Sequence, residues 1–270
     1  MRCGGVLAGF AGALLLAACG GSSPAGTKTG SAPTAAAVLA AALGRAHGAK
    51  TAHLSFQLRV TSGATTLTGT SGGDVDLTGG NADLRFSLSR SQGGGRLIAV
   101  GTTTYLMATG PIGSSLRRAV PTPWASLPSG NLIGGPFTFG SDVIVQLGQL
   151  SELTGVTTKA PTAVDGVMAR HYTGSIDLAA ALARRSPPLA ANTAAAKVVL
   201  SPRAQVDVYV GPDGVPRRIV TSAVDLVAGH SVTLRTTYDL TALGTSVAIT
   251  APPATQVTSD PTFGRAFGTG

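Results

Sequence analysis

The fold is decided by a stretch of alternating apolar and polar residues, TAHLSFQLRVT, at positions 51–61. Its large apolar side chains fall on every second position, at Leu54, Phe56, Leu58 and Val60. Because successive side chains of a β-strand point to opposite faces, a period of two is typical of a strand. The stretch therefore predicts an antiparallel strand with one face on the core and one face in water.

The same alternation recurs at residues 81–89, 204–210 and 231–241. The sequence Gly-Pro-Asp-Gly at 211–214 separates one of these stretches from the next apolar run and indicates a hairpin turn. Shorter apolar stretches at 75–77, 97–100 and 102–108 are also typical of strands. Together they predict about nine to eleven antiparallel strands.

Four helices are predicted beside these strands. The first is Ala35–His47, with Ser31 or Thr34 as its N-cap, and the second is Ser141–Leu153. Two shorter ones span 177–185 and 189–197. The order of elements predicts one α+β domain from Ala35 to Pro253. One sheet of this many strands must curve or split, and the single dry face favours curvature while leaving a two-layer sandwich open.

Composition narrows the classes of partner. The chain has 270 residues, of which 43% are hydrophobic and 12% charged, so wholesale disorder is not expected. The net charge of +8 invites a nucleic-acid partner, but the arginines are scattered and few aromatics lie among them. We therefore expect no nucleic-acid binding, and a basic exterior that faces anionic lipid or wall polymer.

The N-terminus predicts export. Val6–Ala18 is an apolar run too short for a comfortable membrane span, and it ends in Leu-Ala-Ala-Cys at 16–19. This stretch resembles the signal of bacterial lipoproteins, in which the cysteine takes a diacylglyceryl group; the alternative is a secretory signal with a chance cysteine. We expect a signal peptide at 1–18, acylated Cys19, a flexible tether at 19–34 and a loose tail at 254–270.

A second resemblance rests on motifs in order along the chain. Val-Asp-Gly-Val at 164–167 and Arg-His-Tyr-Thr-Gly-Ser-Ile-Asp at 170–177 precede the hairpin of 208–218, and Tyr105 and Trp124 flank a loop before the helix at Ser141. This layout resembles the LppX/LprAFG family of actinobacterial lipoproteins, within the LolA/LolB-like fold. The chain departs from the family in its Gly/Pro-rich stretch at 110–140 and in its C-terminal tail.

The resemblance implies a half-barrel formed by a single curved antiparallel sheet, with helices over the concave face. Between them an apolar cavity would hold the acyl chains of a lipid or glycolipid that the protein carries across the cell envelope. We expect a monomer on the extracytoplasmic face of the cell membrane, anchored through Cys19. A membrane transporter is a possible partner. No cofactor is expected.

Candidate residues follow from this reading. We expect the cavity wall and roof to be formed by apolar side chains, Phe56, Leu58, Phe86, Leu88, Val208, Tyr238, Val143, Ile144, Leu147 and Leu150, and the cavity mouth by Trp124. An ordinary packed core would use the same residues. The alternative function is an anchored module that binds a protein or wall polymer without lipid.

Catalytic and metal-binding patterns are weak. Gly-Thr-Ser-Gly-Gly at 69–73 matches Gly-x-Ser-x-Gly, but a nucleophile elbow needs a strand before it and a helix after it. The four histidines lack metal-ligand spacing, His171 is expected to be structural, and the only glutamate is Glu152. Arg184-Arg185 and Arg217-Arg218 could receive anionic headgroups, although solvated faces explain them as well. We expect no metal site and no enzyme activity.

Overall fold

The computed structural model describes residues 33–89, 93–119, 121–128, 147–185 and 198–259. The chain from Pro33 onward forms a compact unit with a core of its own. The predictions for Cys19, Val143, Ile144 and the helix at 189–197 lie outside the described residues.

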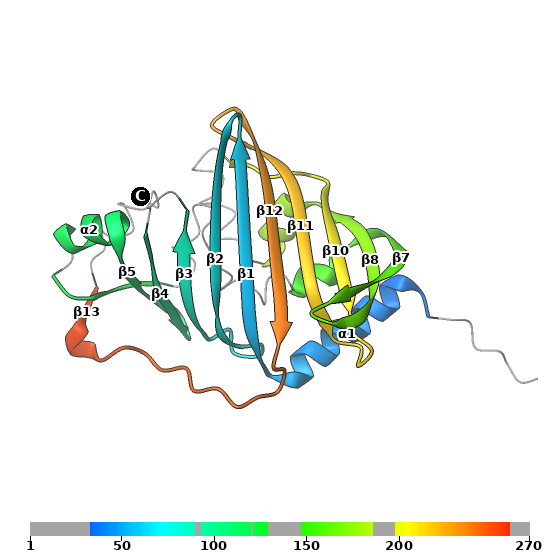
Figure 1. Cartoon of the computed structure of the whole chain (residues 1–270), viewed down its shortest axis with the longest axis horizontal. Helices are drawn as coiled ribbons and strands as arrows, with labels where there is room; N and C mark the ends of the chain where they lie inside the picture. The colour runs from blue at the N-terminus through cyan, green and yellow to red at the C-terminus, as the bar shows by residue number, and fades with distance from the viewer. Residues whose placement is uncertain (1–32, 90–92, 120, 129–146, 186–197, 260–270) are drawn as a thin grey trace, which may run out of the picture. The chain divides into compact units, whose positions relative to one another are not determined.

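The described chain is dominated by one sheet (Figure 1). Its strands are β1 (Thr51–Ser62), β2 (Thr65–Asp76), β3 (Ala82–Leu88), β4 (Gly93–Val100), β5 (Thr103–Ala108), β6 (Trp124–Pro128), β7 (Thr154–Val164), β8 (Val167–Ile176), β9 (Val198–Val199), β10 (Ala204–Val210), β11 (Pro216–Val227), β12 (His230–Thr241) and β13 (Val257–Ser259). The order across the sheet is β13-β6-β5-β4-β3-β2-β1-β12-β11-β10-β8-β7, and β9 pairs with β11 off this path. The two outermost strands, β13 and β7, are not neighbours, so the sheet is open.

The expected single curved antiparallel sheet is confirmed. The sheet has thirteen strands, more than the nine to eleven expected. Two of the additional strands, β9 and β13, have two and three residues and are too short for alternation to reveal them. The β13–β6 pair is parallel, whereas every other pair described is antiparallel.

Helices are few among the described residues. Helix α1 (Ala35–Ala49) begins as predicted, with the side chain of Thr34 accepting a hydrogen bond from the amide of Ala37. Its buried residues, Leu39, Ala42 and Ala46, join the core, and the helix lies near β7 and β11. The predicted helix at 177–185 is α4 (Leu178–Arg185), which Asp177 caps by accepting from the amide of Ala180.

Two elements differ from the sequence prediction. Helix α2 (Gly110–Ala119) lies in the stretch read as Gly/Pro-rich, because proline is tolerated in the first helical turn, where its missing N–H has no partner to lose. The second is the C-terminal stretch from residue 254, which was expected to be a loose tail. The folded chain continues past Pro253 through the short helix η2 (Ala254–Gln256) into β13. Two hydroxyl pairs, Thr122–Thr258 and Ser126–Ser259, accompany the pairing of β13 with β6.

Among the described residues, no helix combines the length and apolar character needed to cross a membrane.

Candidate functional site

The most extended feature of the sheet is its apolar face, defined here as the face that carries Phe56. Register places one row of side chains on this face from β8 to β5, through Tyr172, Val208, Ile219, Tyr238, Phe56, Ser71, Phe86, Gly95 and Ala108. Apart from the hydroxyls of Ser71, Tyr172 and Tyr238, the members of the row present carbon. The row therefore forms a continuous, mainly apolar strip across nine neighbouring strands.

An aromatic pair lies at the middle of this strip. The rings of Phe56 on β1 and Tyr238 on β12 have centroids 4.9 Å apart and planes inclined by 52°. Aromatic pairs at this separation contribute about 0.5–1.5 kcal/mol beyond the area they bury. The pair thus fixes the register between the two strands that join the N-terminal and C-terminal halves of the sheet.

Glycines make room on the apolar face beside the larger side chains. A Cβ added to Gly95 on β4 would lie 2.8 Å from Cζ of Phe86, and one added to Gly69 on β2 would lie 3.0 Å from Cδ2 of Leu88. The side chains of Phe86 and Leu88 therefore lie over their glycine neighbours. The surface of β2 to β4 alternates between large side chains and positions with no side chain.

Residual solvent access is unevenly distributed over this face. Val208, Tyr238 and Leu58 are at most 2% exposed, whereas Phe86 is 7% and Leu88 9% exposed. On the same side of the sheet, Gly93 and Gly95 of β4 are partly exposed. The half of the apolar face under α1 is closed; on β3 to β5, where Leu84 and Leu97 are 0% exposed, the residual access is confined to the end that carries Phe86, Leu88 and the β4 glycines.

The structure brings most of the predicted residues together. One buried cluster contains the eight described candidates for wall and roof, Phe56, Leu58, Phe86, Leu88, Leu147, Leu150, Val208 and Tyr238. Leu147 is buried just before the short helix η1 (Leu150–Glu152), to which α1 lies close. That these residues line a ligand cavity stays a prediction.

Trp124 lies apart from these residues. It is 6% exposed, but it does not belong to the cluster that contains its neighbour Ala125. Since Ala125 pairs with Leu106 on the apolar face, the alternation of β6 directs Trp124 to the other face. The apolar face therefore gives no support to the prediction that Trp124 edges a cavity mouth.

Sequence reasoning missed several members of the cluster, notably Leu84, Leu97, Leu106, Ile219 and Tyr172. Leu84 shares the period of two with Phe86 and Leu88, which was the signal for it. Leu97 and Leu106 lie in short strands whose inward positions only register reveals.

The opposite face, here called the polar face, carries ion pairs. Arg218 on β11 donates from Nε to Oδ1 of Asp239 at 2.5 Å and from Nη2 to Oδ2 at 3.0 Å. These hydrogen bonds raise the pKa of the Arg218 guanidinium. Oδ1 of Asp165, in the turn between β7 and β8, lies 3.7 Å from Nη2 of the same arginine. This arrangement connects β11, β12 and the β7–β8 turn.

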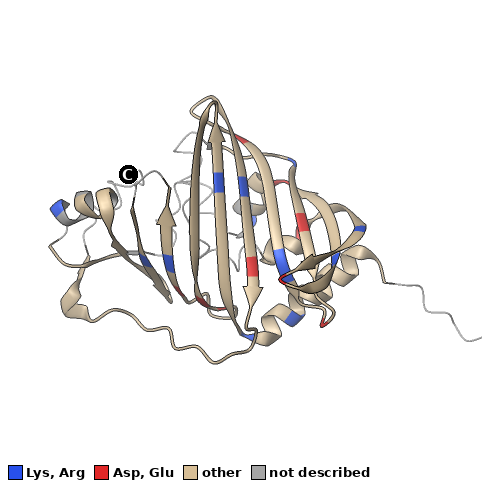
Figure 2. Cartoon of the chain, viewed as in Figure 1, with Lys and Arg blue, Asp and Glu red and all other residues tan. Residues whose placement is uncertain are grey.

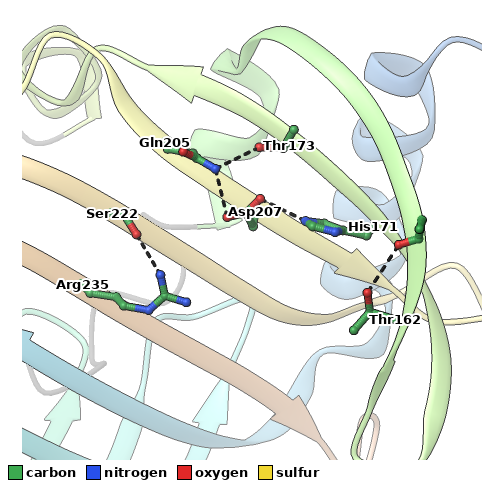
Figure 3. Close-up of polar contacts among 8 residues, drawn as sticks. Thr162, His171, Thr173, Gln205, Asp207, Ser222 and Arg235 are labelled. Atoms are coloured by element: carbon green, nitrogen blue, oxygen red, sulfur yellow. Dashed lines mark hydrogen bonds and ion pairs between the residues drawn. The ribbon is translucent and has the colours of Figure 1, made fainter.

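A second polar group joins β8 to β10 (Figure 3). Nε2 of His171 lies 2.9 Å from Oδ1 of Asp207, and the His171 ring stacks on Tyr209 with centroids 4.4 Å apart. Gln205 donates to both Asp207 and Thr173. Burial raises the pKa of the Tyr209 hydroxyl. These contacts hold neighbouring strands together, as expected for a structural His171.

The structure does not support the catalytic or metal-binding patterns noted in the sequence. Ser71 of the Gly-x-Ser-x-Gly match lies inside β2 on the apolar face and not at a turn from strand to helix. Among the described residues, no group of three or more histidine, cysteine, aspartate or glutamate side chains is placed to hold a metal ion.

Comparison with solved structures finds proteins with a related arrangement. LprF from Mycobacterium bovis aligns with a TM-score of 0.43 and 15% identity, covering 81% of this chain and 96% of its own. The lipoprotein LppX from Mycobacterium tuberculosis aligns with a TM-score of 0.46 and 14% identity over 80% and 98% of the two chains. A LolA superfamily protein from Nitrosomonas europaea gives 0.32 and 9% over 82% and 99%.

The LppX/LprAFG group, which the sequence motifs resemble, is thus represented among the structural neighbours of this chain. No protein-family model matches the chain, and no curated protein sequence does.

Proposed function

We propose that this protein is a lipoprotein, anchored to the membrane through acylated Cys19, that binds the acyl chains of a lipid or glycolipid and carries them across the cell envelope. The observation that carries the proposal is the apolar strip across the curved sheet, from Tyr172 to Ala108. The sequence adds an N-terminus of lipoprotein type and a tether long enough for the domain to leave and regain the bilayer.

The physical case rests on what an acyl chain requires. Removing it from water gains about 0.8 kcal/mol per CH₂, provided that the enclosing surface offers no unpaired polar group. Nine neighbouring strands contribute to the strip, and its polar atoms are limited to the hydroxyls of Ser71, Tyr172 and Tyr238. A carrier needs no bond chemistry, so a binding surface of this kind is sufficient for the activity.

The unequal exposure of the apolar face suggests where the chain would enter. The glycines on β4, together with Phe86 and Leu88, retain solvent access, whereas the region around Val208 and Tyr238 is closed. We therefore place acyl-chain entry on the β3 to β5 side. From there the ligand would extend along the row toward the aromatic pair.

A lipid-transfer assay tests this function. The protein of residues 33–270, which lacks the signal peptide and Cys19, is mixed with donor vesicles that carry a fluorescent-acyl phospholipid and with unlabelled acceptor vesicles. We expect transfer that rises in proportion to protein concentration. Val208→Trp, which fills the strip, should abolish transfer, and the matched control Gln57→Trp on the polar face should not.

Ala108→Trp, at the less closed end of the strip, serves where Val208→Trp fails to fold. Transfer that is unaffected by a folded variant of either kind would show that acyl chains do not use the apolar face. Absence of transfer by the unmodified protein would reject carriage.

The alternative is an anchored module that binds a protein or wall polymer and holds no lipid. The near-complete burial of Phe56, Val208 and Tyr238 is the observation that favours it, because an ordinary core shows the same burial. In that case the same assay shows no transfer, and Val208→Trp changes stability alone.

A further inference from the structure

Exposed apolar side chains gather at one end of the sheet. Of the six large hydrophobic residues that are exposed in the described chain, four lie on β9 and the last part of β11. Their exposed fractions are 60% for Val199, 58% for Val224, 43% for Leu226 and 38% for Val227. We call these four residues the apolar end patch.

Three members of the patch, Val199, Val224 and Leu226, are contiguous on the polar face, whereas Val227 pairs with Val198 and His230 and points to the other face at the end of the strand. Val199 pairs directly with Leu226 across β9 and β11, and Val224 lies two residues before Leu226 on the same face. The one acidic residue between them in sequence, Asp225, is 5% exposed and accepts a hydrogen bond from the amide of Ser201. The exposed surface of the patch is therefore apolar, because the carboxylate that β11 carries within this stretch is buried.

Arginines border the patch on the same face. Arg59 of β1 and Arg235 of β12 are directly opposite each other, and both are exposed. Arg235 lies across from Ser222, one alternate position from Val224, and donates to the hydroxyl of Ser222 at 3.1 Å. Figure 2 shows the two basic positions side by side on β1 and β12. Arg203, just before β10, is exposed as well.

This arginine pair is unfavourable as it stands. Like charges directly opposite each other on neighbouring strands repel. Within the described ranges neither Arg59 nor Arg235 forms an ion pair with a carboxylate, whereas Arg218 on the next strand does. An external anion would relieve the repulsion.

We propose that this end of the domain docks on the surface of a lipid bilayer that contains anionic phospholipids. The apolar end patch would enter the boundary between headgroups and acyl chains, and Arg59, Arg235 and Arg203 would contact the phosphates. An apolar surface with arginines at its border fits this interface, because hydrophobic insertion and attraction to anionic lipid act together. The docking is independent of the acyl anchor and goes beyond the proposed carriage of lipid.

Vesicle binding tests the docking with residues 33–270, so that neither the signal peptide nor Cys19 contributes. We expect co-sedimentation with phosphatidylcholine vesicles that contain phosphatidylglycerol, weaker binding at high salt, and little binding to phosphatidylcholine alone. Arg59→Gln with Arg235→Gln should weaken binding about tenfold or more, since each arginine near an anionic surface contributes about 1 kcal/mol. Val224→Ser with Leu226→Ser should weaken it several-fold.

Matched controls lie elsewhere on the sheet. Met168, 61% exposed, is the second residue of β8, beside the β7–β8 turn at the other end of the strands, and Arg85 lies on β3. Met168→Ser and Arg85→Gln should leave binding unchanged within about twofold. If these controls weaken binding as much as the patch variants do, or if the unmodified protein does not bind anionic vesicles, the proposal is wrong.

A labelling experiment does not depend on the stability of double variants. Residues 33–270 contain no cysteine, so Val224→Cys and Met168→Cys each provide a single site for an environment-sensitive fluorophore. Anionic vesicles should shift the emission to the blue at position 224 and leave it unchanged at 168. A soluble polyanion that reproduces the shift without vesicles would indicate a polymer ligand and overturn membrane docking.

Discussion

Phe56 and Tyr238 occupy opposite positions on β1 and β12, with ring centroids 4.9 Å apart. Phe56 and Tyr238 are separated in sequence by most of the folded chain, and both side chains are 1% exposed. The pair therefore closes a long loop and holds the first and last long strands together at the middle of the apolar face. The stability of the sheet and its proposed binding surface depend on the same contact.

Replacement of Phe56 by alanine should destabilise the domain strongly. The change removes the ring from Tyr238 and leaves a cavity, which costs about 3–5 kcal/mol for a buried phenylalanine. Urea unfolding followed by Trp124, the only tryptophan, measures the loss. Gln57→Ala, exposed on the polar face of the same strand, should change stability by less than about 0.5 kcal/mol. Equal effects would contradict the assignment of the two faces.

Two glycines on neighbouring parts of the sheet should respond differently to alanine. A Cβ on Gly95 would lie 2.0 Å from the carbonyl oxygen of Met107, so Gly95→Ala must displace backbone and should cost about 2–3 kcal/mol. At Gly72 the nearest atom would be the carbonyl oxygen of Leu54 at 3.5 Å, an ordinary contact. Gly72→Ala should therefore be neutral or stabilising by up to about 1 kcal/mol. Thermal unfolding of both variants checks this contrast.

The ion pair of Arg218 and Asp239 should show a measurable coupling. The Asp239 side chain is 10% exposed and would lose its two charge-assisted hydrogen bonds in Arg218→Gln. Because Arg218 is partly exposed, we expect a loss of about 1–3 kcal/mol, below the range for fully buried pairs. A double-mutant cycle with Asp239→Asn measures the coupling. The exposed pair His53–Asp74 provides the control and should couple by less than about 1 kcal/mol.

The pH dependence of stability should carry a contribution from Asp225. Burial raises the pKa of this carboxyl group, although the hydrogen bond from the amide of Ser201 opposes the shift. A raised pKa in the folded state means that the charged form disfavours folding, so this cost is absent at low pH and grows as pH rises through the folded pKa. Asp225→Asn keeps an acceptor for Ser201 and should raise the melting temperature at pH 7.

This gain should disappear below the ordinary aspartate pKa of about 4, where the wild-type carboxyl is neutral in both states. Melting curves of wild type and Asp225→Asn across pH 3 to 8 provide the measurement. A gain of the same size at every pH would indicate that the pKa of Asp225 plays no part.

Much of the fold could be predicted from local sequence patterns. The alternation around Phe56 and Tyr238 was sufficient for the face that each residue occupies, and the helix predicted at Ala35–His47 matches α1 to within two residues. Strands β9 and β13 could not be found in this way, because two or three residues contain no period. They exist through pairing with β11 and β6, which is tertiary information.

The candidate site was predictable in part for the same reason. Phe86 and Leu88 follow the strand period, so their burial on the apolar face could be expected. Trp124 was assigned to the cavity mouth because it follows the loop after Tyr105, and only the pairing of Ala125 with Leu106 shows which face it occupies. The apolar end patch was not recognised, since no pattern in Val199 or Val224 distinguishes exposed from buried valine.

The most direct test of the central claim is identification of what the apolar face holds. The protein of residues 33–270 is purified from a bacterial host without detergent, and its organic extract is quantified by mass spectrometry. Binding of acyl chains predicts a lipid or glycolipid in near-stoichiometric amount, lost in the Val208→Trp or Ala108→Trp variant and retained in Gln57→Trp. A protein that yields no lipid, and takes up none after incubation with vesicles, would contradict the account.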